Sequence, residues 1–332
     1  MIKIGLIGCG HWGPNYIRCF NKLVNSKVVT CCDIKNKNLK RIKELYPKID
    51  LTKDYQEILD NKNIDAVIVA TPATTHYKIT KDCLKSGKDV LAEKPLTLVP
   101  EKSKELADLA KEKKLILMVG HTFLYNPGIV KLKEYIDSGE LGKIYYINAT
   151  RTHLGLIRED VNVLWDLAPH DISIFNYLTD SCPISVNAVG ACCLKKERED
   201  VAFINLVYPK NIIANIHVSW VDSNKERTIR VVGSKARVVF NDLDNLERVK
   251  IYKKGISIPE DYDEFGEFQL NLRDGDIISP MLNLYEPLGE MCAHFLDCVK
   301  NRTVPLTDGY SGYEVVKIMK KIEDILSNSH VL

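Results

Sequence analysis

The chain has 332 residues, of which 45% are hydrophobic and 27% charged, and this length suits two ordinary domains. Its 46 basic and 44 acidic side chains leave a formal net charge of +2, which argues against nucleic acid or a membrane surface as the main partner. No apolar run is long enough to span a bilayer, and the chain enters an apolar segment directly at Ile2, without the pattern of a signal peptide. We therefore expect a cytoplasmic protein that binds neither nucleic acid nor membranes.

Strand-like and helix-like segments alternate over the first 120 residues. Strands are predicted at residues 2–7, 27–32, 66–70, 89–92 and 115–119, and helices at 15–24, 38–46, 55–59, 76–86 and 100–112. Continuous apolar strands with helices between them predict an α/β fold with a doubly wound parallel sheet. Ligands of such sheets bind outside the carboxyl ends of the strands.

The first predicted strand runs directly into Gly8-Cys9-Gly10-His11-Trp12-Gly13, which has the G-x-G-x-x-G spacing, and a helix follows. This context predicts dinucleotide binding, with His11 and Trp12 in the loop beside the cofactor. Gly8 allows a tight turn, Gly10 lets a pyrophosphate approach the backbone, and Gly13 lets the helix pack on the strand. The alternative is an ordinary α/β domain with a glycine turn.

Asp33 ends the second predicted strand, about 20 positions after Gly13, where a dinucleotide site carries an acidic residue. Its carboxylate would accept hydrogen bonds from the ribose hydroxyls and repel a 2′-phosphate, so NAD is preferred over NADP. Lys35 and Lys37 lie close by and keep NADP from being excluded.

Glu93-Lys94-Pro95 follows the predicted strand 89–92 at the same edge of the sheet. A partly desolvated lysine near a cofactor can hydrogen-bond a substrate hydroxyl and stabilise a developing alkoxide. The alternative is that Lys94 is a surface lysine in a loop.

Asp166 and His170 are four residues apart, so they share a face of the helix predicted at 162–178. Oxidation of an alcohol needs a base for the hydroxyl proton, and histidine titrates in the right range. Alternatively, Asp166 is only an acidic residue in the first helical turn, and His170 is a histidine with a structural role.

The pattern changes near residue 123, where runs of strands replace the alternation and predict a mostly antiparallel open sheet. We therefore predict a dinucleotide-binding domain at 1–123 and an α+β domain for substrate binding and oligomerisation at 124–332. In the strand predicted at 212–220, Ile213, Asn215 and His217 share the face opposite Ala214 and Ile216. A helix can cover one face of the sheet. We expect the other face to be a subunit interface, so we predict a homo-oligomer, either a dimer or a tetramer.

The ten cysteines contain no C-x-x-C pair, and free thiols are the expected state. We find no spacing that favours a metal site.

The segments GCGHWGPN, ATPATTHY, AEKP, GHTFLYNP and WDLAPHD, in this order and together with Asp33, resemble the Gfo/Idh/MocA oxidoreductases over essentially the whole chain. The resemblance implies a Rossmann domain, a second domain on a large open sheet, and oxidation or reduction of sugar or cyclitol hydroxyls with a nicotinamide cofactor. By position, Lys94 resembles the active-site lysine of the family, His170 its general acid/base, and Asp166 the carboxylate one turn earlier. Contacts to the cofactor are implied for Thr71, Pro72, His76, Glu93, Lys94 and Pro95.

Within the family, GHTFLYNP, residues 155–162 and WDLAPHD look most like the nucleotide-sugar 3-dehydrogenases. This similarity implies NAD-dependent oxidation of the 3-hydroxyl of UDP-N-acetylglucosamine, which would supply a 3-keto sugar to an aminotransferase. Tyr125, Asn126 and Trp165 are candidates to line the sugar site. Arg151 and Arg158 would meet a diphosphate or a uronate, or else are solvated surface residues.

Other functions stay open. The same fold could act on UDP-N-acetylglucosaminuronate, on a free sugar or inositol, or reduce a 3-keto sugar. A non-catalytic NAD-binding regulator is the remaining alternative, although such a protein would be expected to lose Lys94 or His170.

Overall fold

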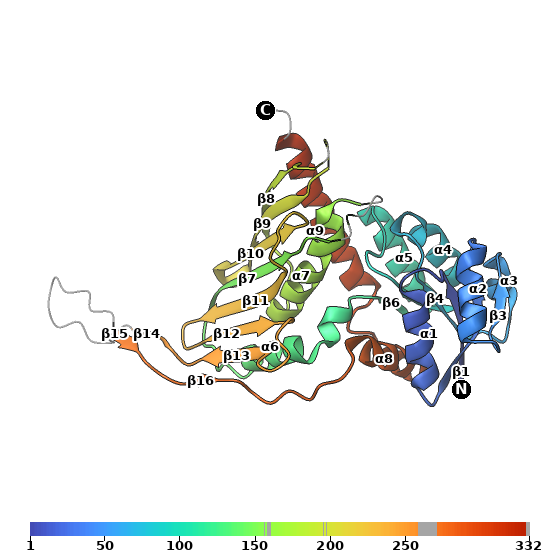
Figure 1. Cartoon of the computed structure of the whole chain (residues 1–332), viewed down its shortest axis with the longest axis horizontal. Helices are drawn as coiled ribbons and strands as arrows, with labels where there is room; N and C mark the ends of the chain where they lie inside the picture. Colours follow the sequence, from blue (N-terminus) through green and yellow to red (C-terminus); the bar gives the residue numbers. More distant parts are fainter. Residues whose placement is uncertain (156, 158–160, 195, 197, 258–270, 330–332) are drawn as a thin grey trace. The chain divides into compact units, whose positions relative to one another are not determined.

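The computed structural model describes residues 1–155, 157, 161–194, 196, 198–257 and 271–329 (Figure 1). The chain divides into two compact units. The first unit contains Met1–Tyr125 and Tyr285–Lys320, and the second contains Asn126–Leu284 and Lys321–Leu332.

The first unit is built on a six-stranded parallel sheet in the order β3-β2-β1-β4-β5-β6. The strands are β1 (Ile2–Ile7), β2 (Ser26–Cys32), β3 (Asp50–Thr52), β4 (Ala66–Val69), β5 (Asp89–Ala92) and β6 (Leu117–Val119). This order has its switch point between β1 and β4, as in dinucleotide-binding sheets. The predicted parallel sheet is confirmed, and the short edge strand β3 is an element that the apolar pattern missed.

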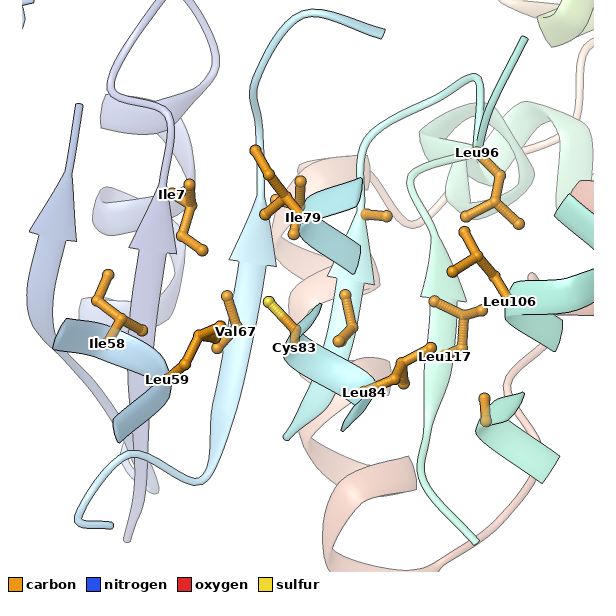
Figure 2. Packing of buried hydrophobic residues seen from close by; sticks show 14 of the residues in the cluster. Ile7, Ile58, Leu59, Val67, Ile79, Cys83, Leu84, Leu96, Leu106 and Leu117 are labelled. Atoms are coloured by element: carbon orange, nitrogen blue, oxygen red, sulfur yellow. The ribbon is translucent and has the colours of Figure 1, made fainter. Parts of the chain in front are cut away.

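Helices connect the strands and bury them. They are α1 (Gly13–Lys22), α2 (Asn36–Leu45), α3 (Gln56–Asp60), α4 (Ala73–Lys85) and α5 (Pro100–Glu112), followed by the 3-10 turn η1 (Thr122–Tyr125). Figure 2 shows one face of the sheet, where side chains of α3, α4 and α5 pack on apolar strand residues. Val67, Leu117 and Cys83 are among these buried residues. Because apolar side chains cover this face of the sheet, the polar groups that could meet a ligand lie at the ends of its strands.

The segment Tyr285–Lys320 returns to the first unit, with α8 (Pro287–Asn301) and the beginning of α9 (Gly309–Ser329). Phe295 of α8 packs edge-on against Phe20 of α1, with 6.3 Å between ring centroids. Thr307 extends the sheet at β6, because its carbonyl accepts from Val119 N–H at 2.7 Å. The predicted division assigned the whole of 124–332 to the second domain, so the structure differs from it over this segment. Chain order alone does not show which sheet a terminal helix covers.

The second unit is built on an eight-stranded sheet in the order β16-β13-β12-β11-β7-β10-β9-β8. Its strands are β7 (Ile144–Thr152), β8 (Ser185–Ala191), β9 (Val201–Tyr208), β10 (Ile212–Ser219), β11 (Glu226–Gly233), β12 (Arg237–Asn241), β13 (Val249–Tyr252) and β16 (Ile277–Ile278). A two-stranded ribbon pairs β14 (Gly255–Ser257) with β15 (Asn271–Arg273), and a 3-10 turn, η2 (Pro209–Asn211), joins β9 to β10. Among the described strands of this sheet, β7 and β10 form the one parallel pair, which confirms the predicted open, mostly antiparallel sheet.

Helices α6 (Pro127–Asp137) and α7 (Val163–Thr179) contact one face of this sheet (Figure 1). Ala214 and Ile216 point to the covered face and are fully buried, whereas Ile213 is 56% exposed. The alternation predicted for β10 is therefore correct. Within the second unit, the opposite face of the sheet keeps large apolar side chains in solvent.

Candidate functional site

The glycine turn after β1 has the geometry that its spacing predicts. Gly8 has φ of +100°, and a Cβ there would lie 2.4 Å from the carbonyl oxygen of Ala70. A Cβ on Gly13 would lie 2.6 Å from the carbonyl oxygen of Gly8. A Cβ on Gly10 would meet no protein atom within 4 Å. The space beside Gly10 is therefore open, and the turn can admit a ligand next to its backbone.

Helix α1 begins directly after this turn and suits an anion. Its N-cap residue, Trp12, makes no side-chain capping hydrogen bond, and its first turn has no acidic residue. Unsatisfied N–H groups and the helix dipole favour negative charge at such an end. His11 and Trp12 are exposed in the loop, with their rings in edge contact. These features fit the diphosphate of a dinucleotide.

Asp33 is held in a fixed position after β2. Its carboxylate accepts hydrogen bonds from Cys9 N–H at 2.8 Å, Lys35 N–H at 2.7 Å and the Asn38 amide at 2.9 Å. A carboxylate has about four acceptor positions, so one acceptor position remains for a hydroxyl. The carboxylate thus both fastens the glycine turn to β2 and can meet a ribose.

Arg41 of α2 also fastens the turn, and sequence reasoning missed it. Its guanidinium donates to the carbonyls of Cys9 and Gly10 at 2.7 and 2.6 Å. No motif marks this residue, because the contact depends on how α2 packs beside the turn.

Lys94 follows β5, and its backbone is anchored by the residue before it. The Glu93 carboxylate accepts from Lys94 N–H at 3.1 Å and from the Tyr16 hydroxyl at 2.6 Å. Burial and the nearby carboxylate raise the pKa of Tyr16 well above its usual range, so this hydroxyl stays a donor. The Lys94–Pro95 peptide bond is cis. The pair Tyr16–Glu93 therefore sets the position at which Lys94 leaves the strand.

His76 joins two of the segments that were predicted to contact the cofactor. Its Nδ1 lies 2.8 Å from the Pro95 carbonyl oxygen and its Nε2 lies 2.7 Å from the Thr71 carbonyl oxygen. His76 is buried, whereas Pro72 is exposed in the loop before α4. Both nitrogens of His76 thus serve the protein backbone.

In the second unit, α7 carries the predicted catalytic pair. Asn162 caps the helix by accepting from Trp165 N–H at 3.1 Å. Asp166 lies in the first turn and His170 one turn later, and both are partly exposed. Pro169 lies inside the helix and not at its start. The shared helix face predicted from the spacing is present.

A buried ion pair fixes α7 to the sheet beside His170. Arg151 of β7 donates from Nε and Nη2 to the two oxygens of Asp171, at 2.9 and 2.8 Å. Both side chains are at least 95% buried. Arg151 is therefore not a solvated surface residue, and two of its donors are committed to Asp171. A contact of Arg151 with a diphosphate or a uronate stays a prediction. Sequence reasoning did not single out Asp171.

The other predicted sugar-site residues also have contacts within their own units. Asn126 caps α6 by accepting from Gly128 N–H and donates to Asp242 at 3.0 Å. Trp165 donates from its indole to Glu323 at 2.9 Å, and Tyr125 is buried beside His294 of α8. Arg158 lies outside the described residues. A role of these residues in substrate binding stays a prediction.

All ten cysteines are free thiols. Within the described ranges, no three His, Cys, Asp or Glu side chains are grouped so that they could hold a metal. The helices of the described part of the chain include none with the length and apolar character needed to cross a membrane.

Two family models match the chain. Residues 2–121 match the oxidoreductase family with an NAD-binding Rossmann fold, and residues 129–239 match the Gfo/Idh/MocA C-terminal domain. The chain belongs to the Gfo/Idh/MocA family. Its cofactor is NAD, which the glycine turn, the uncapped α1 and Asp33 fit, and this Gfo/Idh/MocA protein is an NAD-dependent oxidoreductase.

Curated relatives of this Gfo/Idh/MocA protein differ in substrate. It is 26% identical to UDP-N-acetylglucosamine 3-dehydrogenase of Acidithiobacillus ferrooxidans over 263 residues, which cover 76% of this chain and 78% of that protein. It is also 26% identical to scyllo-inositol 2-dehydrogenase (NAD(+)) of Bacillus subtilis over 266 residues, covering 77% and 73%. A solved structure of the A. ferrooxidans enzyme has the same fold, with a TM-score of 0.81, 23% identity and coverage of 98% and 97%.

Proposed function

We propose that this protein oxidises the 3-hydroxyl of UDP-N-acetylglucosamine to a ketone with NAD⁺, as a supplier of a 3-keto sugar for amination. The observation that carries the oxidation chemistry is Lys94, anchored through Glu93 at the carboxyl edge of an NAD-binding sheet. Support for the sugar nucleotide comes from the relative that is 26% identical over 76% of this chain.

The reaction removes a proton from the hydroxyl and a hydride from the carbon that carries it. Bound NAD⁺ supplies the hydride acceptor. In the proposal, the imidazole of His170 accepts the hydroxyl proton, and the ammonium group of Lys94 donates a hydrogen bond to the same oxygen as negative charge develops on it. Asp166, one turn before His170, orients the imidazole.

A cyclitol is the second candidate substrate. The inositol dehydrogenase of B. subtilis is as similar to this chain as the sugar-nucleotide enzyme is, at 26% identity. The same Lys94 and His170 chemistry would serve either secondary alcohol, because both reactions move one proton and one hydride.

The test is NADH formation by the pure protein with UDP-N-acetylglucosamine, its uronic acid, scyllo-inositol and myo-inositol. Each reaction contains a reagent that traps the ketone, because oxidation by NAD⁺ at neutral pH can stop early. Turnover with UDP-N-acetylglucosamine alone supports the proposal. Turnover with only an inositol or only the uronate replaces the substrate, and no turnover with any of the four contradicts the proposed function.

Two variants test the assigned roles on whichever alcohol is turned over. Lys94→Ala and His170→Ala should each lower kcat at least about a hundredfold while NAD⁺ binding, measured by calorimetry, persists. Lys78→Ala, at an exposed position on α4, is the matched control and should keep normal kinetics. Near-normal turnover in either of the first two variants would remove that residue from the mechanism.

We also propose that the protein is a homo-oligomer that pairs through the open face of the eight-stranded sheet. Tyr146, Phe203, Ile213 and Val189 on this face are between 43% and 59% exposed in the single chain. Between them runs an asparagine row, formed by Asn148, Asn187, Asn205 and Asn215, which occupy matching register positions on neighbouring strands. Amides both donate and accept, so this uncharged row is complementary to a second copy of itself. Light scattering on the purified protein measures the assembly.

A further inference from the structure

His121 lies beside Lys94 at the carboxyl edge of the first unit's sheet. Strands β5 and β6 are parallel, with Ala92 opposite Val119, and two residues further along each strand come Lys94 and His121. A Cβ on Gly120 would lie 3.4 Å from Cα of Glu93, so the two chains are still adjacent after the strands end. The ring of His121 therefore belongs to the same edge as the proposed active-site lysine.

Among the described residues, neither nitrogen of the His121 imidazole has a hydrogen-bond partner. The residue is 2% exposed. Buried polar groups in folded proteins are almost always hydrogen-bonded, and those left unpaired destabilise the fold. A polar side chain kept in this state at a ligand-binding edge indicates that a bound molecule completes its hydrogen bonds.

The ring is neutral in the folded protein. Burial, and secondly the charge of Lys94, lower the pKa of His121 to about 3. A neutral imidazole has one N–H donor and one acceptor nitrogen. A phosphate or carboxylate could satisfy only the donor, whereas a hydroxyl or a primary carboxamide can pair with either nitrogen.

We propose that His121 is a ligand-contacting residue of the reaction site, and that its ring hydrogen-bonds an uncharged hydroxyl or carboxamide group. Two bound molecules carry such groups, namely the sugar through its hydroxyls, and the cofactor through its carboxamide and its ribose hydroxyls. The sugar contact rests on the proposed function, but the cofactor contact does not. The sequence pattern does not single out His121, since its environment depends on burial and on a neighbouring strand.

The test follows the ring nitrogens directly by NMR on full-length protein labelled with ¹⁵N-histidine. The His121 signals are assigned by their loss in His121→Phe. One sample receives NAD⁺, and others receive NADH with UDP-N-acetylglucosamine or with scyllo-inositol, which cannot react because both partners are reduced. A shift of the His121 nitrogens with NAD⁺ alone assigns the contact to the cofactor, and a shift only in a sugar sample assigns it to the sugar.

Calorimetry on variants gives the second readout. His121→Phe keeps an aromatic ring but removes both nitrogens, so the Kd of the molecule that shifts the signals should rise about tenfold. Thr80→Val on α4 is the matched control, because it likewise removes a buried polar group, a hydroxyl that has no partner among the described residues. Its affinities should match the wild type.

The proposal is overturned if the His121 signals stay unchanged with NAD⁺ and with every NADH–sugar pair. In that case the imidazole contacts only the packed interior of the protein. This outcome does not depend on His121→Phe being folded, since the wild-type protein supplies it. A protein that oxidises none of the tested alcohols contradicts the proposed function, while the NAD⁺ sample still decides whether His121 meets the cofactor.

Discussion

Asp33 combines two tasks in one carboxylate, and both depend on its negative charge. It accepts three hydrogen bonds from its own chain, including one from Cys9 N–H in the glycine turn. An amide at this position could not accept from all of these donors, because its nitrogen only donates.

Asp33→Asn should therefore raise the Kd of NAD roughly 10- to 100-fold, the range expected for a lost hydrogen bond to a charged group. The Kd of NADP should rise less, since the repulsion of its 2′-phosphate is also removed. Isothermal titration with both cofactors measures the two effects, with Asp60→Asn on α3 as the control. An equal loss of affinity for NAD and NADP would contradict a role in discrimination.

His121 makes the stability of the protein depend on pH. Its pKa is about 3 in the folded chain and about 6.5 when unfolded. Between these values the unfolded chain binds a proton that the folded chain does not, so the free energy of unfolding falls as the pH falls.

From pH 7 to pH 5, the wild type should lose about 2 kcal/mol more stability than His121→Phe, as these two pKa values require. Urea unfolding at both pH values measures this difference in the ligand-free protein. Parallel pH profiles for the two proteins would show that the ring is not held neutral.

At the scale of elements, a buried ion pair helps to hold α7 on the sheet. Arg151→Met leaves the Asp171 carboxylate buried without its counter-charge, which should lower the free energy of unfolding by about 3–5 kcal/mol. Chemical denaturation measures the loss. The double variant Arg151→Met/Asp171→Leu should recover much of it, and Lys131→Met, which breaks a surface pair with Glu134, should change stability by about 0.5 kcal/mol or less. A loss no larger for Arg151→Met than for Lys131→Met would contradict this view of α7.

The contacts of α7 also mark what sequence patterns can predict. Asp166 and His170 are one helical turn apart, and Gly8, Gly10 and Gly13 act within one turn of chain, so local spacing was enough to find them. Arg151 meets Asp171 from 20 residues away, Asn126 meets Asp242 from 116, and Trp165 meets Glu323 from 158. No local period encodes such pairs, so the sequence did not reveal the protein partners of Arg151, Asn126 and Trp165, three residues predicted to lie at the substrate site.

The strands could also be predicted, because the alternation of their side chains is a local pattern. Alternation along β10 shows which residues share a face, because successive side chains point to opposite sides. The alignment of the asparagine row across four strands depends on the register between strands, which the sequence of one strand does not contain.

At the scale of the whole molecule, we expect copies of the chain to associate through the open face of the eight-stranded sheet. A charge at the centre of this face should separate the copies, so Ile213→Glu should reduce the mass measured by light scattering to that of one chain. Ile213 is 56% exposed in the single chain, so the substitution should leave the fold intact. Val24→Glu, at an exposed apolar residue of the first unit, is the control and should keep the wild-type mass. A wild-type protein with the mass of one chain, or an unchanged mass for Ile213→Glu, would contradict the proposed interface.

The return of Tyr285–Lys320 to the first unit has a consequence for synthesis on the ribosome. The NAD-binding sheet is made first, but β6 cannot gain its contact with Thr307 until about 200 further residues have been translated. At the usual rate of about 5–20 residues per second, this delay is roughly 10–40 seconds. During that time α1 and η1 expose the surface that α8 later covers, so we expect the growing chain to be prone to aggregation until its last helices leave the ribosome.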